Sequence, residues 1–208
     1  MIAVLACVLA VLAQETTKTD NVLKTFVDAV VSLRQGTSES RVALENVLSK
    51  NEKWTLMDEL QDQNGAECRL NSKMKRLNLT PILNKVLAMR HGKSEVPGHY
   101  LNGEDPRYDY SLTERGITAR GKVSYTMKGR VGEQDFVFVT AGNKGLPITV
   151  RFVKGKTALK TTTLPSPDGT LHLHIGEKLK SSDRITMEIS NTSGTSVAVT
   201  ILNHNTRK

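Results

Sequence analysis

Alternation of apolar and polar residues in the second half of the chain constrains the fold more than any other feature of the sequence. The alternating stretches are short and are separated by turn residues such as glycine, asparagine and aspartate. Short strands at close spacing, without helical segments between them, predict an antiparallel sandwich or barrel. The expected strands are residues 108–112, 122–128, 134–140, 147–153, 157–164, 170–175, 184–190 and 196–202.

The same alternation predicts which side chains form the core. Val123, Tyr125 and Met127 alternate with polar residues in the second expected strand, and neighbouring side chains of a strand point to opposite faces of its sheet. Ile185 and Met187 alternate in the same way further along the chain. One apolar and one polar face per strand predict a single core between two sheets.

The first half of the chain shows the spacing of amphipathic helices instead. Leu23, Phe26, Val27 and Val30 recur at intervals of three and four residues, which predicts a helix with one apolar face. We expect this helix to end at Gly36, because glycine readily adopts the left-handed conformation that terminates helices.

Three further helices are expected before the sandwich. The second helix is capped by Thr37 or Ser38 and ends at Asn51. A short third helix covers residues 54–60. The last helix begins at Thr80–Pro81, because threonine suits the cap and proline the first turn. The expected core-facing residues are Val42, Leu44, Val47 and Leu48 in the second helix, Trp54, Leu56, Met57 and Leu60 in the third, and Ile82, Leu83, Val86, Leu87 and Met89 in the last.

Residues 93–109 match neither pattern and hold several glycines and prolines. A long loop in a compact protein is usually functional or a linker. We therefore expect an α+β protein with a helical region at 14–92, a linker loop at 93–109 and an antiparallel β-sandwich at 110–208.

This loop is the preferred place for a ligand site, because loops on rigid scaffolds carry function disproportionately. Its candidate ligand-binding residues are Tyr100, Asp105, Arg107 and Tyr108. Turn formation at Asp105-Pro106 explains the same residue types equally well.

The N-terminal residues predict export. Residues 2–13 are an apolar run, too short to span a bilayer, which takes about 20 residues. Val11 and Ala13 match the small-residue positions of a signal peptide at 1–13, although no basic residue precedes the run. The alternatives are a buried core segment and lipid attachment at Cys7. Export places the protein in the periplasm, at the cell surface or outside the cell, without a transmembrane span.

Positive charge is concentrated in the sandwich. From Ile117 onward there are 14 Lys and Arg against 6 Asp and Glu, whereas the preceding residues are balanced. Arg151, Lys154 and Lys156 lie around one expected hairpin, and Lys178, Lys180 and Arg184 form a second group. A solvated basic face is the simple interpretation, and contact with a polyanion such as an anionic glycan is the alternative. Nucleic acid is not expected, because aromatic residues for base stacking make up only 4% of the chain.

His172 and His174 are weak candidates for metal ligands. Residues two apart on a strand share a face, so both imidazoles could reach one ion. Zinc needs further ligands, and the sequence assigns none. Alternation with leucine places both histidines most simply on the outer face, so neither a metal nor a cofactor is expected.

No phosphate-binding glycine loop, Gly-x-Ser-x-Gly elbow, His-Glu-x-x-His helix or Cys-x-x-Cys pair is present. The leading hypothesis is an exported, non-enzymatic binding or assembly module, with an envelope or secreted protein or an anionic glycan as its partner. The alternatives are a metal-dependent or acid/base hydrolase using loop and sheet-edge residues, and an inhibitor or chaperone of a secreted enzyme.

The segments Val123–Val139 and Ile185–Ile201 resemble pre-peptidase C-terminal-type domains of bacteria in their succession of strand, turn and strand. The resemblance implies a jelly-roll-like β-sandwich of the kind appended to secreted proteins, where it acts in targeting, binding or folding. The Ala13–Glu15 junction looks like that of exported proteins of Bacteroidota.

Overall fold

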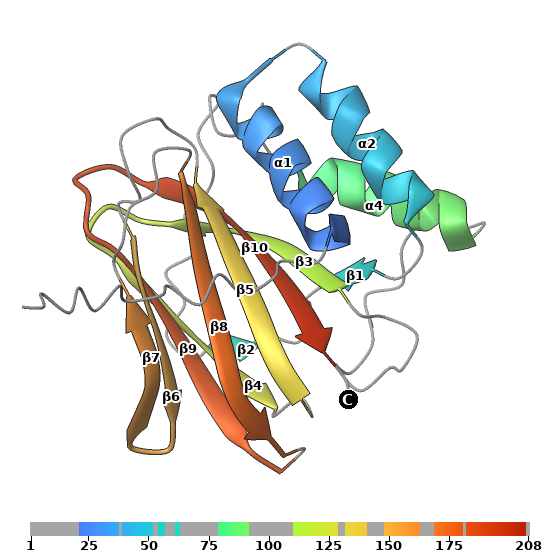
Figure 1. Ribbon diagram of the computed structural model, residues 1–208. Helices are drawn as coiled ribbons and strands as arrows, with labels where there is room; N and C mark the ends of the chain where they lie inside the picture. The colour runs from blue at the N-terminus through green and yellow to red at the C-terminus, as the bar shows by residue number, and fades with distance from the viewer. Residues whose placement is uncertain are drawn as a thin grey trace, which may run out of the picture.

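The computed structural model describes residues 21–37, 39–51, 54–56, 61–62, 79–91, 110–128, 132–140, 148–162, 169–180 and 182–206 (Figure 1). The expected signal peptide and the linker loop lie outside these residues. Among the described residues, no helix has the length and apolar character needed to cross a bilayer.

The helices come first and most of the strands follow. The helices are α1 (Asn21–Gln35), α2 (Ser40–Lys50) and α4 (Thr80–His91), with two short strands, β1 (Trp54–Leu56) and β2 (Gln61–Asp62), between α2 and α4. The remaining strands are β3 (Tyr110–Ile117), β4 (Lys122–Lys128), β5 (Gly132–Thr140), β6 (Ile148–Lys154), β7 (Thr157–Thr162), β8 (Thr170–Leu179), β9 (Arg184–Asn191) and β10 (Val197–Thr206).

The strands form two five-stranded sheets. Sheet A has the order β1-β3-β10-β5-β8 and sheet B the order β2-β4-β9-β6-β7. Strands β3 to β10 pair antiparallel throughout, in the interleaved order of a jelly roll. The predicted α+β class and the jelly-roll-like sandwich are therefore confirmed.

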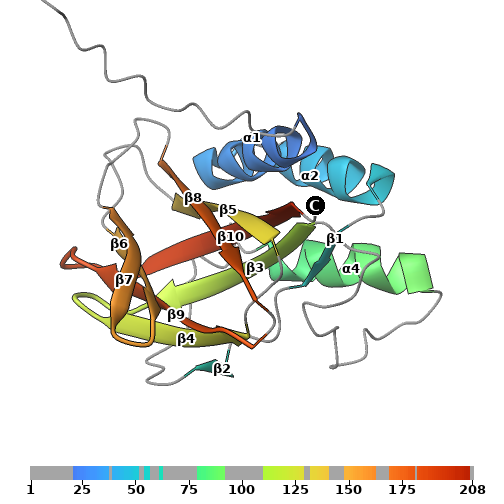
Figure 2. The same cartoon turned by 60° about the horizontal axis from the view of Figure 1, so that its bottom comes forward.

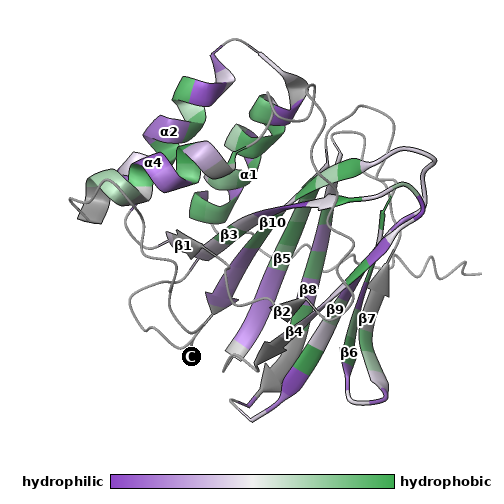
Figure 3. Cartoon of the chain, turned by 180° about the vertical axis from the view of Figure 1, so that it is seen from behind, coloured by the Kyte–Doolittle hydropathy of each residue, from purple (hydrophilic) through white to green (hydrophobic). Residues whose placement is uncertain are grey.

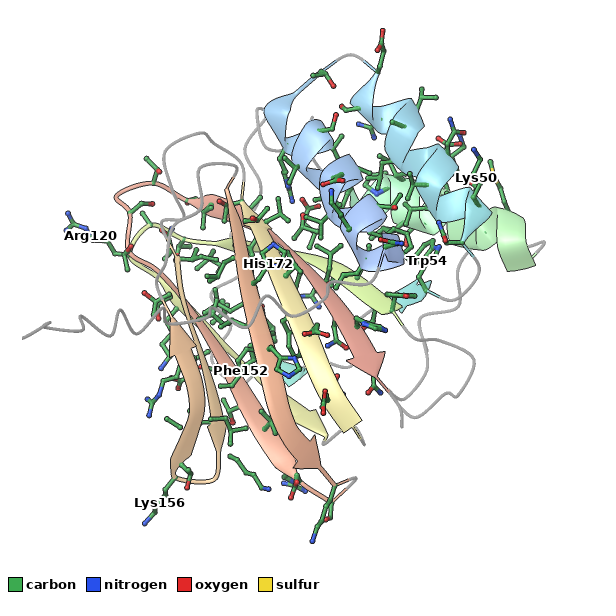
Figure 4. All side chains as sticks on the ribbon, in the orientation of Figure 1. Lys50, Trp54, Arg120, Phe152, Lys156 and His172 are labelled. Carbon is green, nitrogen blue, oxygen red and sulfur yellow. The ribbon has the colours of Figure 1, made fainter. Side chains whose placement is uncertain are left out.

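Alternation along the strands places one apolar face of each sheet in a shared core. Tyr125, Phe136, Phe138 and Phe152 are fully or almost fully buried there, and Phe152 lies between the layers in Figure 4. The ring centroids of Phe136 and Phe152 are 4.8 Å apart, so the two sheets contact each other directly. The switch between hydrophobic and hydrophilic residues along the strands is visible in Figure 3.

The helices cover the other face of sheet A, so the molecule has three layers (Figure 2). Phe26 of α1 and Leu83 of α4 belong to a second core cluster with Leu112, Val137 and Leu202 of sheet A. The sequence left open whether the helical region packs against the sandwich. The structure shows that it does, and that sheet A is apolar on both faces where the helices lie.

The predicted third helix around Trp54 is wrong. Trp54 instead begins β1, which runs parallel to β3, and β2 pairs antiparallel with β4. The indole of Trp54 is completely buried, and its Nε1–H donates to the carbonyl of Leu48 at 2.8 Å. Pairing with strands far away in sequence fixes this segment, and local periodicity carries no information about such pairing.

The helix boundaries agree with the prediction better than the helix faces do. Gly36 ends α1 with a φ of 80°, whereas the N-cap of α2 is Glu39 rather than the predicted Thr37 or Ser38. Val42 and Met89 were expected in the core, but they are 63% and 61% exposed. α2 and α4 therefore bury a narrower stripe than their hydrophobic residues suggest, whereas Leu23, Phe26 and Val30 of α1 are buried as predicted.

A buried ion pair joins the helices to sheet A. Arg34 of α1 contacts the Glu114 carboxylate of β3, and each side chain is 2% exposed. Arg34 also donates to Thr200 of β10 at 2.6 Å, and the other oxygen of Glu114 accepts the N–H of Leu79 at 3.1 Å. Burial lowers the pKa of Arg34 from its ordinary value, against the opposing effect of Glu114. One carboxylate therefore holds α1, the start of α4 and sheet A together.

Candidate functional site

The predicted site residues separate into three groups. Tyr100, Asp105, Arg107 and Tyr108 lie outside the described residues. The three predicted basic residues lie on sheet B: Arg151 and Lys154 on β6, and Lys156 in the turn that follows. The histidines His172 and His174 lie on β8, at the edge of sheet A.

A tight turn places two of the lysines at the end of the β6–β7 hairpin. Lys154 pairs with Thr157, so only Gly155 and Lys156 lie between the strands. Gly155 has a φ of +60°, which other residues adopt with strain. Lys156 is exposed at the hairpin tip, where Figure 4 shows it pointing away from the sandwich.

Asp183 fixes this hairpin to the neighbouring β8–β9 turn. Its Oδ2 lies 3.0 Å from Nζ of Lys154 and accepts the N–H of Lys180 at 2.8 Å. The N–H of Lys180, and then the ammonium of Lys154, lower the pKa of Asp183 below its ordinary value. The carboxylate thus bridges two turns that are far apart in the sequence.

The two turns together form a cationic cluster, which we call the basic end. It consists of Lys154, Lys156, Lys180 and Arg184, with Asp183 as the acidic side chain among the described residues of the two turns. The sequence indicated two separate basic groups, and the structure brings them side by side through the pairing of β6 with β9. The role of Asp183 was missed, although Ser181-Ser182-Asp183 has the residue types that dominate turns.

Arg151 belongs to a more balanced part of sheet B. Glu188 of β9 lies between Lys122 of β4 and Arg151 of β6, at 2.8 Å and 3.6 Å from their nitrogens. Two cations share one carboxylate here, so this part of the face carries less excess charge than the basic end.

Acidification is expected to release the Asp183 bridge. Because the pKa of Asp183 is lowered in the folded state, its stabilising contribution is complete above the ordinary carboxyl value of about 3.9. It is lost as the pH falls through the lower folded-state value. In an NMR titration, the Lys180 amide should shift with a midpoint below the ordinary value, and Asp183→Asn should abolish that shift. A midpoint at or above the ordinary value contradicts this account.

A polar row crosses sheet A from Tyr110, which contacts Phe26 of α1, to the edge strand β8. Tyr110, His204, Asp135 and His174 are direct cross-strand neighbours on β3, β10, β5 and β8. His204 stacks on Tyr110 with 4.8 Å between ring centroids. Asp135 places one oxygen 2.7 Å from Nδ1 of His174 and the other 3.8 Å from Nδ1 of His204.

The prediction that His172 and His174 act as a pair receives no geometric support. His174 instead lies between Asp135 and Glu133, with its Nε2 3.9 Å from Oε2 of Glu133. Within the part of the chain that the structure describes, no three or more His, Cys, Asp or Glu side chains converge to hold a metal ion. No pattern along the chain indicates this row, because the register between β5, β8 and β10 creates it.

Comparisons with known proteins found likenesses in structure that cover about half of the chain. No family model matches the chain, and no curated protein matches it in sequence. The mitogen derived from Yersinia pseudotuberculosis is similar in structure, with a TM-score of 0.37 and 15% identity over 48% of this chain and 87% of the mitogen.

Two further structures show a likeness of the same extent. The periplasmic inhibitor of g-type lysozyme from Aeromonas hydrophila has a TM-score of 0.33 and 11% identity, over 47% of this chain and 87% of the inhibitor. A carbohydrate-binding module of a xylanase from the hindgut metagenome of Trinervitermes trinervoides has a TM-score of 0.31 and 17% identity, over 45% of this chain and 78% of the module. At such scores these likenesses carry no argument about what this chain binds.

Proposed function

We propose that this protein is an exported, non-enzymatic binding module that attaches to an anionic polysaccharide through the basic end of sheet B. The supporting observation is that Lys154, Lys156, Lys180 and Arg184 lie on or beside two adjoining turns, which Asp183 joins through the side chain of Lys154 and the N–H of Lys180. The export component rests on the apolar run at residues 2–13.

Electrostatics favours a polymeric anion over a small one at such a site. An exposed ion pair contributes roughly 0.2–1 kcal/mol, so no single lysine of the basic end binds tightly. A polyanion that contacts all four cations adds these contributions, and the positive field also speeds its approach. Both effects weaken with salt, because the Debye length is about 8 Å at physiological ionic strength.

The three-layer architecture leaves this end accessible. The helices lie on the outer face of sheet A, whereas Lys154, Lys156 and Arg184 belong to sheet B and its turns. The bridge by Asp183 also holds Lys154 in place before binding. A pre-ordered side chain loses less conformational entropy when a ligand contacts it.

Charge reversal tests the proposal. Lys154→Glu, Lys156→Glu and Arg184→Glu in one chain should weaken binding to heparin about tenfold or more in low salt, since each lost contact contributes roughly 0.2–1 kcal/mol before the added repulsion. The measurement is isothermal titration calorimetry at several salt concentrations, with neutral dextran as the uncharged probe.

The matched control reverses three exposed lysines of the helices, Lys24, Lys50 and Lys85. Both variants have the same net charge, so the comparison isolates where the charge lies. We expect the control to bind heparin within about twofold of the wild type, since distant exposed charges are screened. Equal weakening in the two variants, or no binding by the wild type, contradicts the proposal.

A further inference from the structure

We propose that His174 and Glu133 form a surface half-site for zinc on the uncovered part of sheet A, with solvent completing the coordination. This site is separate from the basic end, because β5 and β8 belong to the other sheet. The proposal rests on the hydrogen bond between His174 and Asp135, on the distance between Nε2 of His174 and Oε2 of Glu133, and on the exposure of both side chains.

The hydrogen bond with Asp135 fixes the state of the His174 ring. An ionised carboxylate only accepts hydrogen bonds, so Nδ1 of His174, 2.7 Å from Asp135, carries the proton. In the neutral ring the lone pair then lies on Nε2. This is the nitrogen that faces Glu133, so a carboxylate holds the imidazole in the form that binds metals.

The separation of the two proposed ligands suits a bridging ion. Nε2 of His174 and Oε2 of Glu133 are 3.9 Å apart, which is too long for a direct hydrogen bond. Zinc lies about 2.0–2.2 Å from nitrogen and carboxylate ligands. An ion between the two atoms therefore satisfies both bonds with a wide ligand–zinc–ligand angle, and a small side-chain rotation brings that angle to the tetrahedral value.

Exposure supplies the remaining coordination positions. The side chains of His174 and Glu133 are 31% and 33% exposed, so water reaches the ion. Because no third protein ligand converges among the described residues, the site is open and weaker than a structural zinc site. An open position is also where a ligand oxygen would bind.

The row beyond His174 supports its orientation. Asp135 has its second oxygen 3.8 Å from His204, and His204 stacks on Tyr110. These contacts restrict Asp135, which in turn restricts the His174 ring. Loss of such a supporting carboxylate typically weakens metal binding 10- to 100-fold, so Asp135 acts here as a positioning residue.

Metal titration of the full chain tests the site. With zinc chloride alone as the probe, we expect the wild type to bind one equivalent more than His174→Ala by calorimetry, and Glu133→Gln to lose most of that affinity. Asp135→Asn should weaken the same equivalent about 10- to 100-fold. Cobalt(II) in place of zinc should give visible absorption bands in the wild type that His174→Ala lacks.

His172→Ala is the matched control, because His172 lies on the same strand and face two residues away. His172→Ala should bind as much zinc as the wild type, one equivalent more than His174→Ala. Each variant is checked by circular dichroism to show that the sheet is intact. The proposal is overturned if the wild type and His174→Ala bind the same amount of zinc, or if His172→Ala and His174→Ala reduce binding equally.

Discussion

Glu114→Ala is expected to lower the free energy of unfolding by about 3–5 kcal/mol, the usual cost of removing one partner of a buried ion pair. The substitution leaves the Arg34 guanidinium inside the protein without the carboxylate that it contacts. It also removes the acceptor for the N–H of Leu79. Urea denaturation followed by circular dichroism measures the loss.

Two controls show whether the loss of stability comes from leaving a buried charge unpaired. Arg34→Met combined with Glu114→Leu replaces both charges by apolar groups and should recover most of the lost stability, since such exchanges are often neutral. Asp28→Ala removes one partner of a surface pair with Lys24, in which both side chains are 64% exposed. That loss should stay below about 1 kcal/mol. A Glu114→Ala effect as small as the Asp28→Ala effect contradicts the account of the helix–sheet contact.

Trp54→Ala is expected to lower the free energy of unfolding by about 3–5 kcal/mol, the range for truncating a buried aromatic side chain. The indole is completely buried, and its N–H donates to the carbonyl of Leu48 in α2 at 2.8 Å. Figure 4 labels Trp54 beside the helices. Since β1 is only three residues long, its pairing with β3 depends on this anchor.

Trp54→Phe is the matched variant, because it keeps the apolar ring and removes the N–H donor. Trp54→Phe should lower the free energy of unfolding by less than Trp54→Ala does. Trp54 is the only tryptophan of the chain, so its fluorescence in the wild type reports directly on this junction. Emission typical of a water-exposed indole, or a Trp54→Ala loss below that of Trp54→Phe, contradicts the placement of β1.

The fold was predictable to the extent that local patterns determine it. Residues 122–128 were predicted as a strand and form β4 with those bounds. β8 and β10 extend beyond their predicted ends, to Leu179 and Thr206. Both extensions contain charged or amide residues that local propensity disfavours in strands, and cross-strand pairing keeps them extended.

Long-range contacts account for what the sequence did not reveal. β1 and β2 each join a sheet through partners about 55–65 positions further along the chain, and no periodicity of two or three residues is informative at such a separation. The packing of helices on sheet A also depends on apolar residues at Leu112, Val137 and Leu202, which alternation alone assigns to the outer face.

In the candidate sites, too, the local sequence indicates the residue types, and long-range strand pairing determines which residues lie together. The sequence indicated two basic groups, around Lys154 and around Lys180, and the pairing of β6 with β9 brings the two segments together. The polar row on sheet A combines residues from four strands. The signal peptide at 1–13, the loop residues Tyr100, Asp105, Arg107 and Tyr108, and the resemblance to pre-peptidase C-terminal-type domains stay predictions.

Amide chemical-shift mapping with a heparin oligosaccharide tests most directly whether the two sheets have different roles. We expect the largest changes at residues 154–157 and 180–184, fading as salt is added, with little change in α1, α2 or the row around Asp135. Changes centred on the helices or on sheet A would contradict the assignment of polyanion binding to sheet B.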